Sequence, residues 1–177
     1  MKFSWKDPLF RFLVIALGGY LAWYLFYDLY LSQHTNADHA MSVSLVRIAE
    51  VMLGIFGYET ILETEYVDVT IKLADAQYNG VWVGDTCNGF ILFALFTIFV
   101  LAYPGSWKRK LWFIPAGILA IHLINAIRVS ILTIISETAP ETLTFNHNYT
   151  FTILVYAFVF YLWYVWANRL SKTSIRK

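Results

Sequence analysis

The sequence has little cysteine and little charge, and it has no cluster of metal-binding side chains. A single cysteine stands among its 177 residues, which excludes an internal disulfide and a scaffold held together by disulfides. The four histidines are scattered, and none pairs with the cysteine at the spacing of metal ligands, so we expect no metal and no cofactor. The net charge of +1 provides no basic field that would indicate nucleic acid as a partner.

Apolar residues are in excess, and they lie in long runs. They make up 59% of the chain, and 14% of the residues are charged, whereas a soluble domain is nearer half apolar and about a quarter charged. A helix of about 20 apolar residues crosses the bilayer core. The sequence therefore predicts an all-α integral membrane protein, a single membrane-embedded domain over residues 1–177, with about four transmembrane helices at approximately 10–31, 87–103, 111–136 and 148–168.

The first apolar run raises the alternative of a cleaved signal peptide, because small residues follow it at positions 37–40. Its apolar part, residues 12–31, is longer than the usual signal-peptide core of about 7–15 residues. We therefore expect a retained transmembrane helix.

Positive charge alternates between the connections and predicts an orientation. Basic residues precede the first run, separate the second from the third and follow the fourth, whereas the other two connections hold few. By the positive-inside rule, both termini and the 104–110 loop are cytoplasmic, and the insert at 33–85 is extracytoplasmic. The basic residues are Lys2, Lys6, Arg11, Lys108, Arg109, Lys110, Arg169, Lys172, Arg176 and Lys177.

The extracytoplasmic insert contains two recognisable patterns. Apolar residues recur at helical spacing from Leu45 to Phe56, which predicts an amphipathic helix. Residues 66–73 alternate between apolar and polar, Asn79 and Gly80 indicate a turn, and 81–83 are apolar again, which together predict a β-hairpin. The hairpin leads directly to the cysteine.

Cys87 lies where this polar segment meets the second apolar run. If the helix begins there, its unpaired N–H groups favour the thiolate, and Asp85 opposes that effect through its own negative charge. The alternative is a small packed side chain, since many cysteines behave as inert hydrophobic residues. The expected topology places this thiol at the outer end of the second span.

Arg128 and His147 are the other chemically distinctive residues. An arginine inside an apolar run is costly in a membrane, which makes it a functional candidate. His122, Asn125 and Arg128 recur every three residues and share a helix face, with His122 expected to hydrogen-bond another helix. His147 precedes the fourth run. The alternatives for Arg128 are a structural arginine paired with a carboxylate or with carbonyls, and one that reaches outward to the interface. The alternative for His147 is a solvated loop histidine.

Three reactive residue types on successive spans suggest one catalytic site. A cysteine nucleophile needs a base that shares its proton and a donor for the oxyanion formed on the attacked carbonyl. His147 is a candidate for the first role and Arg128 for the second. Such sites are recognised by geometry and not by chain order.

The chain resembles the exosortase/archaeosortase family over about residues 80–155, in the fragments DTCNGF, HLINAIRVSILTI and FNHNYTF. The family pattern is a cysteine followed closely by glycine, then Asn-x-x-Arg, then histidine. These are Cys87 with Gly89, Asn125 with Arg128, and His147 in this sequence. Many members carry serine where this chain has asparagine after the cysteine, and many have about eight spans. The chain is most similar to a short form, the XrtF type.

The resemblance implies a membrane cysteine protease or transpeptidase of the prokaryotic plasma (inner) membrane, with its site on the extracytoplasmic side. Its clients carry a C-terminal motif, a transmembrane helix and a basic tail. Cys87 would be the nucleophile, forming a thioacyl intermediate, with Arg128 stabilising the oxyanion and His147 as general acid and base. Gly89, Asn125, Asp85 and His122 are expected supporting residues.

Two functions of other classes remain open at this stage. In a non-enzymatic scaffold or assembly factor, Arg128 would pair with an acidic residue of a partner helix and Cys87 would only pack. In a small transporter, His122, Asn125 and Arg128 would line a pathway, although the sequence shows no repeat of the kind many transporters have. Either would tolerate substitution of Cys87, whereas the enzyme would not.

Overall fold

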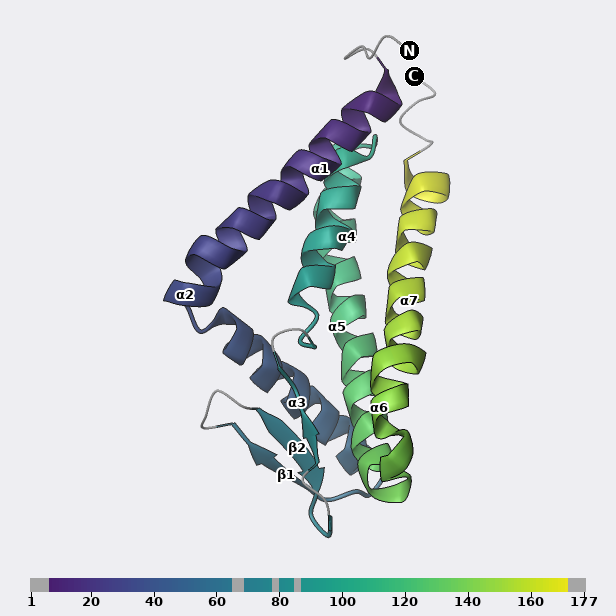
Figure 1. The fold of residues 1–177 in the computed structure, drawn as a ribbon. Coiled ribbons are helices and arrows are strands. Elements are labelled where there is room, and N and C mark those ends of the chain that lie inside the picture. Colours follow the sequence, from purple (N-terminus) through teal and green to yellow (C-terminus); the bar gives the residue numbers. More distant parts are fainter. Residues whose placement is uncertain (1–6, 65–68, 78–79, 85–86, 172–177) are drawn as a thin grey trace. The chain divides into compact units, whose positions relative to one another are not determined.

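The structure is a computed structural model that describes residues 7–64, 69–77, 80–84 and 87–171. The chain forms two compact units, each built from segments that are distant in sequence (Figure 1). The first unit contains Met1–Thr35, Ile91–Leu119 and Phe158–Lys177, and the second contains Asn36–Phe90 and Ala120–Ala157.

Three helices are long and apolar enough to cross a membrane, within the part of the chain that the structure describes: Pro8–His34, Trp107–Thr138 and Pro140–Leu170. The remaining apolar helix, α4 (Phe90–Ala102), has 13 residues and is about 20 Å long, which is short for a full crossing. The predicted all-α membrane fold with a small β insert is confirmed, but three helices of spanning length replace the four expected. The placement of both termini on one side stays a prediction.

The first spanning helix begins at a well-defined cap. Asp7 accepts a hydrogen bond from the Leu9 N–H at 2.9 Å, and Pro8 occupies the first helical position, where no N–H is needed. Helix α1 (Pro8–Phe26) continues through a π-helical turn at Tyr27–Leu31 into α2 (Ser32–His34). None of its residues is buried, as expected for a helix that faces lipid.

Helix α5 (Trp107–Thr138) packs closely on α4 within the first unit. The Phe96 ring is fully buried, and its nearest atom lies only 2.2 Å from the position that a Cβ atom on Gly117 would occupy. The missing side chain at Gly117 therefore lets the two helices approach.

The basic residues expected in a loop at 104–110 lie instead in the first turn of α5. Lys110 is buried, and its ammonium group donates hydrogen bonds to the carbonyls of Leu101 and Tyr103, at the end of α4. Arg109 donates to the Leu170 carbonyl at 2.6 Å, at the end of the last helix. Cations stabilise the unpaired carbonyls at helix C-termini, so these charges help to hold the first unit together.

The last spanning helix is interrupted by tighter and wider turns. It runs through a 3-10 turn at Pro140–Thr142, α6 (Leu143–Phe145), a π-helical turn at Asn146–Thr150, α7 (Phe151–Val165) and a second π-helical turn at Trp166–Leu170. The connection expected at 136–150 is thus mostly helical. Its turn at Asn146–Thr150 carries His147.

The second unit begins with α3 (Ala37–Ile55), which corresponds to the predicted amphipathic helix but starts eight residues earlier than Leu45. Leu45, Ala49 and Leu53 are buried as the pattern predicts. Phe56 was expected on the same apolar face, but it is 79% exposed because the helix ends at Ile55.

The insert also holds a three-stranded antiparallel sheet of β1 (Thr60–Glu63), β2 (Thr70–Leu73) and β3 (Val81–Trp82), in the order β1-β2-β3. The predicted hairpin corresponds to β2 and β3, while residues 66–68 and Asn79 lie outside the described residues. Strand β1 was not predicted, because Thr60–Glu63 is a short segment with charge at its end.

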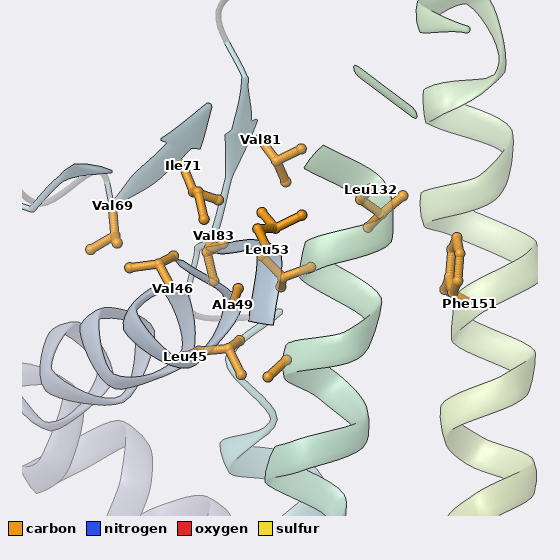
Figure 2. Close-up of a cluster of buried hydrophobic side chains, with 12 residues drawn as sticks. Leu45, Val46, Ala49, Leu53, Val69, Ile71, Val81, Val83, Leu132 and Phe151 are labelled. Atoms are coloured by element: carbon orange, nitrogen blue, oxygen red, sulfur yellow. The ribbon is translucent and has the colours of Figure 1, made fainter. Parts of the chain in front are cut away.

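The core of the second unit joins α3, the sheet, the C-terminal half of α5 and the first residue of α7 (Figure 2). Its members are Leu45, Val46, Ala49, Leu53, Val69, Ile71, Val81, Val83, Ala126, Val129, Leu132 and Phe151. The core therefore anchors Val81 and Val83, which lie six and four residues before Cys87 in the sequence. The partly buried Cys87 packs against this core.

The contact at Gly117 gives a test of the first unit. Gly117→Ala should destabilise the protein by about 1–3 kcal/mol, because the buried Phe96 ring must move to admit the methyl group. The matched control is Gly18→Ala, where nothing lies within 4 Å, so that the change is neutral or stabilising by up to about 1 kcal/mol. Thermal unfolding in detergent measures both, and equal melting temperatures for the two variants would contradict the close packing.

Candidate active site

The described site residues belong to the second unit. Cys87 precedes α4, Asn125 and Arg128 lie on α5, and His147 lies in the π-helical turn before α7. Asp85, an expected supporting residue, lies outside the described residues. A core shared by α3, the sheet and α5 thus places residues from distant parts of the sequence in one compact unit.

A short turn presents the cysteine. The Cys87 N–H donates to the Gly84 carbonyl at 2.9 Å, and Gly89 has φ of +86°, a left-handed conformation that a side chain would strain. The Asn88 Oδ1 atom accepts a hydrogen bond from the Phe90 N–H at 2.9 Å and so caps α4. The helix begins at Phe90, so the condition under which Cys87 would be its first residue is not met.

The thiol meets an imidazole. Cys87 Sγ lies 3.2 Å from His147 Nε2, within hydrogen-bonding distance for sulfur, and both residues are half-buried. The histidine is carried by a π-helical turn, a local widening of the helix that is frequent at functional sites. It therefore belongs to a helix and not to a solvated loop.

The other ring nitrogen of His147 is also engaged. His147 Nδ1 lies 3.0 Å from Asn148 Oδ1, and because this oxygen only accepts, Nδ1 is the donor in that contact. A neutral imidazole then has its acceptor at Nε2, which faces the thiol. Asn148 was quoted in the sequence fragment but not assigned a role, because only the structure shows which way its amide points.

Arg128 lies on the histidine side of the site. Its side chain is 9% exposed, and its Nη2 donates to the His147 carbonyl at a long 3.4 Å. In the described ranges the only ion pair joins Lys72 and Glu63, so no described carboxylate neutralises this guanidinium. Within the described residues, Arg128 thus contacts the backbone of His147.

Asn125 supports the cysteine from α5. It is fully buried, and its Nδ2 donates to the Cys87 carbonyl at 2.9 Å. Arg128 is one helical turn further along, so the Asn-x-x-Arg spacing lets one face of α5 address both Cys87 and His147.

His122 lies one turn before Asn125 and has a different contact. Its Nε2 is 3.1 Å from Ser44 Oγ on α3, the kind of interhelical hydrogen bond expected from the sequence. Across the described residues, no group of three or more His, Cys, Asp or Glu side chains is arranged to hold a metal ion.

The turn at Cys87 predicts a selective effect of strain. Gly89→Ala should cost about 1–2 kcal/mol through its positive φ and should also change the alkylation rate of Cys87 by displacing the turn. Gly57 has φ of +84° with nothing within 4 Å, so Gly57→Ala carries the same backbone strain away from the thiol. We expect similar melting temperatures and different alkylation rates. Equal alkylation rates would show that the turn does not determine the accessibility of the thiol.

The comparison with known families gives one match. The family model for transmembrane exosortase (Exosortase_EpsH) matches residues 4–165, a range that contains every site residue described above. No curated protein and no solved structure is a match. Because the match covers most of the chain and three helices have spanning length, the protein is a multi-pass membrane protein that belongs to the transmembrane exosortase family.

Proposed function

We propose that the protein is a membrane cysteine peptidase or transpeptidase that cleaves the C-terminal sorting signal of envelope proteins. The observation that carries this proposal is the 3.2 Å contact between Cys87 Sγ and His147 Nε2. A nucleophile within reach of a base, with the base itself oriented by a third group, is the arrangement used in cysteine peptidases. Cys87, His147 and Asn148 have this relation.

The reaction would follow from that geometry. His147 Nε2 takes the thiol proton while Cys87 Sγ bonds to the carbonyl carbon, whose oxygen takes up the electron pair. As the oxyanion collapses, the C–N bond breaks and the leaving amine receives the proton from His147, which leaves a thioester on Cys87. An acceptor amine or water then attacks the thioester, His147 takes its proton, and that proton returns to the departing sulfur.

Arg128 would stabilise the charge that develops in this reaction. Its buried guanidinium reaches the His147 carbonyl and has no carboxylate partner in the described ranges. A preorganised cation of this kind is worth about 10²–10³-fold in rate when it stabilises an oxyanion in a site shielded from water. The arrangement gives no support to a purely structural arginine paired with an acid.

Clients would reach the site through the membrane. We propose that they carry a C-terminal motif, a transmembrane helix and a basic tail, and that the chain is a short form of the XrtF type in the prokaryotic plasma (inner) membrane. With both termini cytoplasmic, the insert that contains α3 and the sheet would be extracytoplasmic, and so would Cys87. The bilayer is the other partner, and nucleic acid is not one.

Trapping of the thioester tests the proposal. In membranes of the native host, wild-type protein should carry an acyl adduct on Cys87 that hydroxylamine releases, detected by mass spectrometry. Because base catalysis contributes about 10²–10⁴-fold, His147→Ala should reduce the rate of adduct formation by at least about 10²-fold. His34→Ala, which removes an exposed histidine of α2, should leave the adduct unchanged. Continued maturation of envelope proteins by Cys87→Ala would support the scaffold alternative instead.

A further inference from the structure

A buried polar pair lies behind the cysteine turn, and neither of its members belongs to the Cys–His–Arg set. Asp38 is in the first turn of α3 and is 9% exposed, and Asn88 follows the cysteine and is fully buried. Asn88 Nδ2 donates to Asp38 Oδ1 at 2.8 Å, and the Asp38 carbonyl lies 3.4 Å from the same nitrogen. Fifty positions separate these two residues in the sequence.

Both polar atoms of the Asn88 amide make a defined hydrogen bond. Its oxygen accepts the Phe90 N–H and caps α4, so its nitrogen must donate, and Asp38 supplies the acceptor. A reversed amide would present its nitrogen to the Phe90 N–H and its oxygen to the carboxylate, which are two unfavourable contacts. The Asp38 carboxylate therefore fixes the orientation of this amide.

The amide in turn fixes the cysteine. Asn88 is bonded to Cys87 on one side and to Gly89, with its left-handed conformation, on the other. Once its side chain is held between α3 and α4, the Cys87 thiol has little freedom to move relative to His147. Asn125 restrains the Cys87 carbonyl from α5, so the turn is held from two helices.

We propose that Asp38 is a positioning residue for the Cys87 nucleophile, acting through the Asn88 amide. This inference rests on the proposed peptidase function and adds a residue outside the region that carries the sequence resemblance. A carboxylate suits the place, because the positive end of the α3 dipole favours negative charge in the first turn of the helix. A residue on α3 thereby controls the geometry of a thiol that precedes α4.

Exchanging the two side chains tests the pair directly. Asn88→Asp places two carboxylates against each other and should slow thioester formation and Cys87 alkylation by about 10²-fold, the cost of misplacing a reacting group by about 1 Å. Asp38→Ala should have a similar effect, and Asp38→Asn a smaller one because an acceptor oxygen remains. The double variant Asp38→Asn with Asn88→Asp restores donor and acceptor in reversed order, and should recover most of both rates.

A matched control separates positioning from general loss of stability. Ser130→Ala removes a buried hydroxyl of the same unit that is not part of the cysteine turn. This hydroxyl donates a hydrogen bond of 2.9 Å to the Ala126 carbonyl. It should lower the melting temperature without changing the alkylation rate of Cys87 relative to wild type. The pH dependence of alkylation should become steeper in Asp38→Ala, like that of an ordinary thiol, because a displaced thiol loses its coupling to His147. It should keep its wild-type form in Ser130→Ala.

Failure of this inference is distinguishable from failure of the proposed function. If wild-type protein forms the thioester but Asp38→Ala forms it at the wild-type rate, Asp38 has no positioning role and the peptidase proposal stands. The same conclusion follows if the double variant is no better than Asn88→Asp. If wild-type protein forms no thioester while alkylation still depends on Asp38, the pair positions a thiol that is not a peptidase nucleophile.

Discussion

The contact between the Cys87 thiol and the His147 imidazole requires two segments sixty positions apart to hold a fixed geometry. Most of the second unit contributes to this requirement. The shared core of α3, the sheet and α5 anchors the strand before the cysteine, while Asn125 and Asn88 restrain the turn itself. The histidine side is fixed by a π-helical turn and by Asn148. A displacement of any of these elements would separate the thiol from the imidazole.

Several buried polar groups in this apolar chain join two elements. Burial of an amide or a charge is costly unless it finds a partner, and a satisfied partner makes the geometry specific. Asp38 with Asn88 and Asn125 with the Cys87 carbonyl are of this kind, and so, in the other unit, is Lys110 with the end of α4. Arg128 differs, since the contact that the structure gives its guanidinium is a long hydrogen bond to the His147 carbonyl.

Sequence patterns predicted the class of fold, and they singled out Cys87 and His147, which the structure brings into contact. Both were accessible because apolar runs and scarce reactive side chains are visible locally. They did not predict that α4 starts at Phe90, since the apolar run begins earlier and the positive φ of Gly89 has no unambiguous sequence signal. They also did not single out Asp38, because nothing in the sequence distinguishes it from the other acidic residues of the insert. Only the packing of α3 shows that it contacts Asn88. Long-range pairing is decided by packing, which periodicity does not reveal.

The most direct measurement of the central claim is the labelling rate of Cys87 by a small membrane-impermeant thiol reagent between pH 5 and 9, in wild type and in His147→Ala. If His147 shares the thiol proton, labelling of the wild-type protein stays substantial at pH 6. Labelling of His147→Ala at pH 6 is then much slower. The labelling rate of an ordinary thiol instead rises about tenfold for each pH unit, as long as the pH is well below the pKa of the thiol. The same steep profile in both proteins, or an unreactive thiol even in detergent, would contradict the account.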